Sequence, residues 1–340
     1  MCSPCASPRP DRSTTTSTST KEPRIPKPSY NRTIHRDLVH RASVAEVFVT
    51  GLRATDDGRH EAAIQLPRSH AYFGDHTESW LRSGDLLLLQ EAFRQSGMAV
   101  MHRFHGLPTS TAFLLRTLEI EDVAQTPWRR DPSPARLVCD VSLVRPFLAG
   151  DRLVGGLVAM ALSRDGAPGA KAQYSFSGTT RGQWEALRAS AREGLGLTGE
   201  PRALPPGERA SPATVGRIDR RNVVITEPRE SEEGLRADLV VDTDHATLFD
   251  HPLDHVPGAL VVEAARQLAV AFVGKNTEEP MELRRLTARF TSFIELDLVA
   301  TATAVATSER DDLSVVCQVS QKGRDAASIT LQYRPVRAWT

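Results

Sequence analysis

The chain has 340 residues, which is long enough for two domains. Its 42 lysine and arginine residues balance 42 aspartate and glutamate residues, so the formal net charge of zero gives no reason to expect nucleic acid as the main partner. No apolar run reaches the ~18 residues that a membrane-spanning helix needs, so we expect no membrane association.

The N-terminal segment 1–34 is rich in Ser, Thr and Pro and has almost nothing to bury, so it is predicted to be a disordered tail. It lacks the apolar stretch of a signal peptide, which favours a cytoplasmic protein. Cys139 and Cys317 fall inside predicted strands, which is typical of reduced, intracellular cysteines. Cys2 and Cys5 form a CxxC, but no second ligand pair follows at zinc spacing, so we expect no metal or other cofactor.

The first half of the chain is predicted to contain two short strands, one long apolar helix and four further strands. The strands are expected at 45–53, 60–66, 112–123, 135–146, 153–164 and 170–180. The helix begins near Asp85, a suitable N-cap, and carries Glu91, Arg94 and Gln95 on an otherwise apolar surface. A helix at 183–193 and a Pro/Gly-rich linker at 194–212 follow.

The second half repeats this order. Strands are expected at 222–226, 235–242, 283–295, 299–307, 313–321 and 327–334, with an apolar helix that begins at Gly258. The loop His70–His76 matches His245–His251 in spacing, and Glu-Ala-Phe-Arg-Gln at 91–95 matches Glu-Ala-Ala-Arg-Gln at 263–267. The offset of about 172 to 175 residues indicates two copies of a whole domain.

Each copy is therefore an α+β domain in which one apolar helix needs a surface around it. The short connections between strands favour an antiparallel sheet, which can curl around the helix. We expect a first domain at 35–182, a helix and linker at 183–213, and a second domain at 214–340. The two sheets can pair edge to edge.

The helix in the second half carries a polar stripe that needs an explanation. Glu263, Arg266 and Gln267 are three and four residues apart, so they share one face of a helix that is otherwise apolar. A buried carboxylate or guanidinium costs several kcal/mol unless it is paired or serves a site. An ion pair that satisfies two buried groups and a catalytic site both fit this pattern, and its recurrence as Glu91 and Arg94 does not decide between them.

The run from His251 to Gln267, HPLDHVPGALVVEAARQ, resembles the motif of hotdog-fold acyl-thioester enzymes. Pro-Gly followed by apolar residues and Glu-Ala-x-x-Gln is typical of 3-hydroxyacyl carrier-protein dehydratases, although the spacing from His251 to Glu263 is shorter here. The tandem arrangement, His-Val-Pro-Gly and Glu-Ala-Ala-Arg-Gln are more similar to the A-factor biosynthesis (AfsA-type) family. This resemblance covers about residues 35 to 340, and its first-half part lacks the His-Val-Pro-Gly element.

The resemblance implies a tandem hotdog acyltransferase that makes γ-butyrolactone or butenolide signalling molecules. Members join a β-ketoacyl group, carried on acyl carrier protein, to the hydroxyl of dihydroxyacetone phosphate. Candidate docking surfaces for the acidic carrier protein are the basic residues of 217–229 and those at 128–130, although a solvated charged face also explains them. Further association into a homodimer stays open.

This chemistry suggests roles for the motif residues. The helix end at Gly258 can receive the thioester carbonyl, and Glu263, with a pKa raised by burial, can act as the base. His251 and His255 are the other candidate bases, and Arg266 suits a phosphate.

Because pockets in paired hotdogs form between the two units, further residues are expected to bind substrate. These are Gln267, Glu91, Arg94 and His76. Two alternatives stay open: a carrier-protein dehydratase or thioesterase that uses the same Glu and His, and an inactive scaffold that binds an acyl ligand or a regulatory partner.

Overall fold

The computed structural model describes residues 29–78, 85–122, 133–309 and 312–336. Most of the predicted tail and the basic residues at 128–130 therefore lie outside the described part of the chain. In the described ranges, no helix is both long enough and apolar enough to cross a membrane.

The two halves contain the same elements in the same order. The first half holds β1 (Val49–Ala54), β2 (His60–Leu66), α1 (Leu86–Phe104), β3 (Ala112–Asp122), β4 (Ala135–Ala149), β5 (Arg152–Arg164) and β6 (Ala167–Thr179). The helix α2 (Arg181–Glu193) connects it to β7 (Arg229–Ser231), β8 (Gly234–Asp238), α3 (Gly258–Asn276), β9 (Met281–Phe290), β10 (Ala300–Glu309), β11 (Asp312–Gln321) and β12 (Arg324–Pro335).

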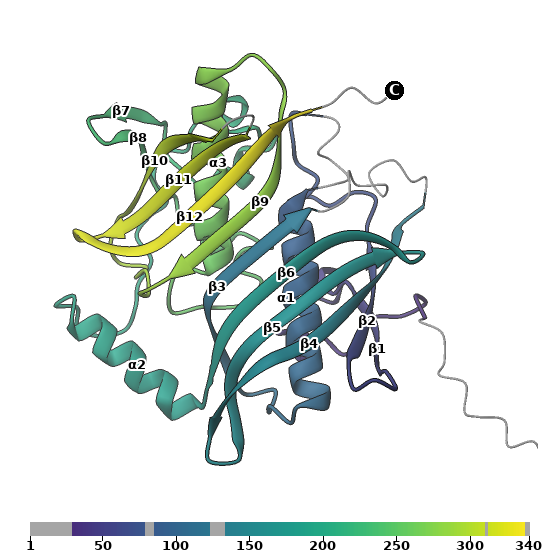
Figure 1. Ribbon diagram of the computed structural model, residues 1–340. Coiled ribbons are helices and arrows are strands. Elements are labelled where there is room, and N and C mark those ends of the chain that lie inside the picture. Colours follow the sequence, from purple (N-terminus) through teal and green to yellow (C-terminus); the bar gives the residue numbers. More distant parts are fainter. Residues whose placement is uncertain (1–28, 79–84, 123–132, 310–311, 337–340) are drawn as a thin grey trace, which may run out of the picture.

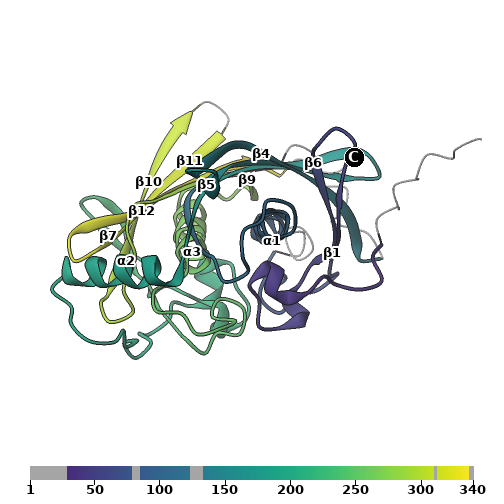
Figure 2. The ribbon, with the colours of Figure 1, turned by 90° about the horizontal axis from the view of Figure 1, so that it is seen from below.

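All twelve of these strands form one sheet in the order β1-β2-β4-β5-β6-β3-β9-β12-β11-β10-β8-β7. Antiparallel pairing of β3 with β9, from Thr117–Arg289 to Glu121–Arg285, joins the halves. The sheet arches over α1 and α3, which lie side by side beneath it (Figures 1 and 2). The predicted tandem hotdog is confirmed.

Burial of the two helices explains the arch. Residues of α3 from Leu260 to Ala269 are all buried, so this helix needs apolar contacts on nearly every side. Alternating strand residues supply them: Leu286 and Ala288 on β9 are buried, as are Val315, Cys317 and Val319 on β11. The sheet therefore provides each helix with a curved apolar wall.

The prediction of a strand at 222–226 is wrong. A short 3₁₀ helix and a hydrogen bond to a helix side chain take the place of the expected strand pairing. Its start belongs to a short 3₁₀ helix, Arg220–Asn222, and only Ile225 makes an isolated bridge, to Leu239. The Val224 amide donates instead to Gln267 Oε1 at 2.9 Å. In the first half, the Phe48 amide likewise donates to Gln95 Oε1, at 2.8 Å. A helix side chain thus takes hydrogen bonds that a strand neighbour would otherwise make.

Candidate active site

The polar stripe on α3 forms a buried ion cluster around the Glu263 carboxylate. Arg217 Nε and Nη2 donate to Glu263 Oε1 at 3.0 and 2.8 Å. Arg266 Nε donates to Oε2 at 2.8 Å, and Gln267 Nε2 also donates to the carboxylate. The side chains of Arg217 and Glu263 are both 0% exposed. Arg217, expected on a possible docking surface, is therefore an interior residue.

This environment lowers the pKa of Glu263, so the expectation that burial raises it is wrong. Burial alone acts in that direction, but the guanidinium groups of Arg217 and Arg266 outweigh it and hold the pKa at about 2. Glu263 is therefore a carboxylate at neutral pH with its lone pairs already occupied. A general base needs a pKa nearer the working pH, so these contacts favour the ion-pair interpretation.

The first half contains the same cluster around Glu91. Arg41 Nε and Arg94 Nε donate to the Glu91 carboxylate at 3.0 and 2.8 Å, and Gln95 Nε2 donates to it at 2.7 Å. The pKa of Glu91 is likewise lowered to about 2, because these two guanidinium groups outweigh burial. The recurrence predicted from the sequence thus extends to a second arginine, which lies before each hotdog helix.

Both clusters connect the two halves. Arg217 of the second half donates through Nη1 to the carbonyl oxygens of Tyr72 and Asp75, at 2.6 and 2.9 Å. Arg41 of the first half donates through Nη1 to the Thr247 carbonyl, at 3.1 Å. Each arginine thus bonds a glutamate of its own half and the loop of the other half. We call these two sets of contacts the crossed braces.

Arg266 and Arg94 were both predicted to bind substrate, but their guanidinium groups are largely occupied by bonds within the crossed braces. Arg266 is 4% exposed and bonds Glu263 with two nitrogens. Arg94 is more open, with 25% of its side chain exposed, but it is held by Glu91 and by the Val39 carbonyl. The predicted phosphate contact of Arg266 would require this cluster to open.

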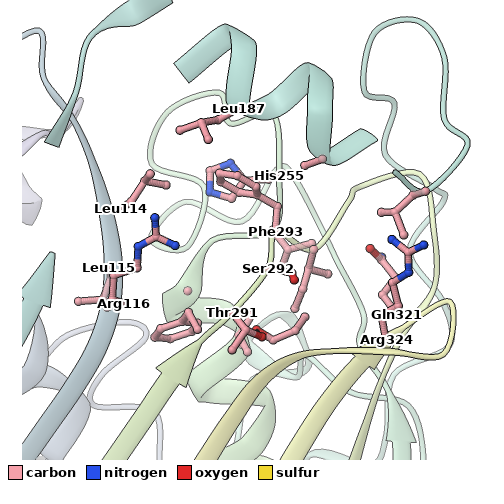
Figure 3. Close-up of a pocket in the computed structure, with 18 of the residues that line it drawn as sticks. Leu114, Leu115, Arg116, Leu187, His255, Thr291, Ser292, Phe293, Gln321 and Arg324 are labelled. Atoms are coloured by element: carbon pink, nitrogen blue, oxygen red, sulfur yellow. The ribbon is translucent and has the colours of Figure 1, made fainter. Parts of the chain in front are cut away.

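A separate pocket lies between the halves at the start of α3 (Figure 3). Its volume is about 470 Å³, within the range of small-molecule sites. The first half contributes the run 113–116 of β3, α2 contributes one wall, and the second half contributes His255, Gly258 and 290–294. Of the predicted site residues, His255 and Gly258 line this pocket, whereas Glu263, Arg266 and Gln267 do not.

The two central helices differ at their N-terminal ends. Asp85 caps α1: its Oδ1 accepts from the Leu87 amide at 3.0 Å, and its Oδ2 lies 3.0 Å from His76 Nε2. At α3 the N-cap is Pro257, which makes no side-chain hydrogen bond to the helix. The positive end of the α1 dipole is thus met by the chain's own carboxylate, while the α3 end faces the pocket.

His255 is held in one orientation by a carboxylate. Its Nδ1 lies 2.7 Å from Asp254 Oδ1, and Asp254 Oδ2 accepts from Trp184 Nε1 and Arg188 Nε, both at 3.1 Å. Burial raises the pKa of Asp254, but His255 and Arg188 outweigh it and keep this side chain ionised. Within the described residues Nε2 of His255 has no hydrogen-bond partner, so with Nδ1–H donating to Asp254 it is the basic nitrogen.

The other two predicted histidines lie elsewhere. His251 is 42% exposed, sits 3.7 Å from Asp250, and has its pKa lowered mainly by burial. His76 is buried against Asp85. Neither lines the pocket. His70 and His245, which open the two matching loops, accept backbone hydrogen bonds within those loops through Nδ1.

Two groups of residues at the candidate site were not anticipated. Trp184 and Arg188 are four residues apart on α2, within the helix predicted at 183–193, and this spacing places them on one helix face toward the His255 loop. Arg116 and Arg324 line the pocket. Nothing in their local sequence distinguishes them from other strand arginines.

Comparisons with known proteins identify relatives over most of the chain. The family model of the A-factor biosynthesis hotdog domain matches residues 25–180 and 200–337. A 2-oxo-3-(phosphooxy)propyl 3-oxoalkanoate synthase from Streptomyces virginiae is 35% identical over 78% of this chain and 84% of its own. An identically named protein from Streptomyces coelicolor is 30% identical over 70% of this chain and 71% of its own. Among solved structures, a dehydratase domain from Mycobacterium tuberculosis superposes with a TM-score of 0.49 at 10% identity, over 84% of this chain and 97% of that domain.

The crossed braces predict a large loss of stability when Glu263 is replaced by Gln. The variant leaves Arg217 and Arg266 buried without a counter-charge, which costs about 3–5 kcal/mol of unfolding free energy. Urea unfolding followed by circular dichroism measures this, with Arg221→Met, at an exposed ion pair, as the control that leaves stability unchanged. A Glu263→Gln protein as stable as the wild type but without turnover would instead support the catalytic role predicted from the sequence.

The same clusters predict how stability depends on pH. The folded-state pKa of Glu263 and of Glu91 is about 2, below the ordinary value of 4.5. Their contribution is therefore complete above pH 4.5 and is lost as the pH falls from 4.5 to about 2. Urea midpoints measured across this interval should fall, and more steeply in the wild type than in Glu263→Gln. Equal slopes would contradict the assignment.

Proposed function

Because the chain belongs to the A-factor biosynthesis hotdog family, we propose that it transfers a β-ketoacyl group from acyl carrier protein to dihydroxyacetone phosphate. The match to a named synthase at 35% identity over 78% of the chain is the observation that carries this proposal. The name of that relative describes an ester between a 3-oxo acid and the free hydroxyl of dihydroxyacetone phosphate. A synthase of such an ester needs an activated acyl donor and this acceptor.

His255 is our candidate for the general base. Its Nε2 takes the proton of the acceptor hydroxyl as the oxygen attacks the thioester carbonyl carbon, and Asp254 stabilises the imidazolium that forms. The tetrahedral intermediate then collapses: the carbon–sulfur bond breaks, and the departing thiolate takes the proton back from His255. The acyl group moves directly from sulfur to oxygen.

The open end of α3 is our candidate for the oxyanion site. Negative charge develops on the carbonyl oxygen during the attack, and free amides at a helix N-terminus are suited to stabilise it. Gly258 begins α3 and lines the pocket, and no side chain from the preceding Pro257 competes for the first-turn amides. The matching end of α1 is occupied by Asp85, so we assign one active pocket to the chain.

Glu263 and Arg266 then act as positioning residues. Glu263 lies within two turns of Gly258 on α3, and it connects that helix, through Arg217, to the loop that contains Tyr72 and Asp75. Their replacement should disturb the pocket by loosening the contact between the halves. Glu91 and Arg94 have the same role on α1.

The proposed activity predicts a strict requirement for the acceptor. The purified protein is incubated with β-ketoacyl carrier protein, with and without dihydroxyacetone phosphate, and products are identified by mass spectrometry. Ester that forms only with the phosphate supports transfer. Free β-keto acid without the acceptor would indicate a thioesterase, and tight acyl binding without turnover would indicate a scaffold.

The pocket predicts which histidine carries the reaction. His255→Ala should lower kcat by about 10²–10⁴-fold, because a positioned base contributes about that much. His251→Ala, outside the pocket, should keep a rate near that of the wild type. Thermal unfolding of both variants checks that the fold is intact. A large loss of activity in His251→Ala, with little in His255→Ala, would contradict this assignment.

A further inference from the structure

Two arginines line the pocket without a counter-charge in the described residues. Arg116 and Arg324 are exposed, and none of the ion pairs or hydrogen bonds within the described ranges includes either guanidinium. By contrast, Arg188, Arg217 and Arg266 nearby are each bonded to a carboxylate. A free guanidinium in a pocket can bind an anionic ligand with paired N–H donors.

Arg116 is directed into the pocket by an irregularity in β3. The pairing of β3 with β6 shifts register between Leu115 and Thr117, so Arg116 is an extra residue with no partner on β6. Pairing with β9 begins only at Thr117. Bulges of this kind redirect a side chain and are frequent beside active sites. The bulge therefore lies where the two halves of the sheet meet and the pocket opens.

Arg116 and Arg324 occupy different parts of the pocket. In Figure 3 the Arg116 guanidinium extends into the same region as the His255 ring, whereas Arg324 lies with Gln321 on the opposite side. In dihydroxyacetone phosphate a three-carbon chain separates the reacting hydroxyl from the phosphate. An acceptor with its hydroxyl at His255 therefore has its phosphate within the same end of the pocket.

We propose that Arg116, from the first hotdog, binds the acceptor's phosphate and makes the enzyme specific for a phosphorylated acceptor. This inference rests on the proposed acyl transfer and adds the residue that selects the acceptor. It replaces Arg266, whose guanidinium is committed to Glu263. Acceptor recognition then comes from one half of the chain and the base from the other.

The test compares two acceptors, dihydroxyacetone phosphate and dihydroxyacetone, with the same β-ketoacyl carrier protein. In the wild type, kcat/KM should favour the phosphorylated acceptor. In Arg116→Met this preference should fall by about 10–100-fold, since hydrogen bonds between charged groups contribute about that much. The KM for the acyl carrier protein should not change. Arg116→Lys should restore part of the preference.

Two further variants make the test specific. Arg289→Met removes an exposed arginine of β9 that does not line the pocket, and it should leave the preference unchanged. If Arg324→Met loses the preference while Arg116→Met keeps it, the phosphate lies at the other end and the proposal is wrong.

Direct binding separates failure of this inference from failure of the proposed function. Isothermal titration of dihydroxyacetone phosphate into the full-length protein, without an acyl donor, should detect binding in the wild type and a loss in Arg116→Met. Equal binding by both proteins would overturn the role of Arg116 even if the enzyme makes ester. If the variant loses binding and the wild type forms no ester, the role of Arg116 in anion binding is supported and the proposed acyl transfer is contradicted.

Discussion

Two buried carboxylates, Glu91 and Glu263, hold the halves of this chain together, and the pocket depends on them. Each binds the arginine of its own helix and a second arginine, Arg41 or Arg217, which also reaches the loop of the other half. Charges this deeply buried are tolerated because every one has a partner. When one partner is removed, the remaining buried charges are unpaired, and their desolvation strongly destabilises the fold. The position of α3 relative to the first half, and hence the shape of the pocket between them, depends on this network together with the pairing of β3 with β9.

The fold could be predicted from the sequence where the pattern is local. The strand at His60–Leu66 begins and ends, and the helix α3 begins, at residues that their alternation, caps and turns indicate. The duplicated order of elements then indicated that each sheet curls around one helix and that the two sheets can pair edge to edge. The strand prediction at 222–226 failed because the Val224 amide donates to the side chain of Gln267, about forty residues away. Strand propensity carries no information about such a contact.

The candidate active site was harder to predict than the fold, because it too depends on contacts between residues that are far apart in the chain. The sequence singled out Glu263 and Arg266 as unusual, but the direction of the Glu263 pKa shift depends on Arg217, which lies 46 positions earlier in the chain. Arg116 looks like any strand arginine until the pairing of β3 with two neighbours reveals the bulge. Two residues of the predicted motif, His255 and Gly258, do line the pocket. They could be predicted because the loop and the helix end are adjacent in sequence, so their geometry is largely local.

The unequal ends of the two helices have an evolutionary consequence. In a dimer of identical hotdog chains, any substitution that places a carboxylate at one helix end places it at both, and activity is lost in both sites together. Joining the copies in one polypeptide removes that restriction. Asp85 could then close the end of α1 while the end of α3 stayed open, and the first copy could supply residues of β3, among them Arg116, to the pocket beside α3.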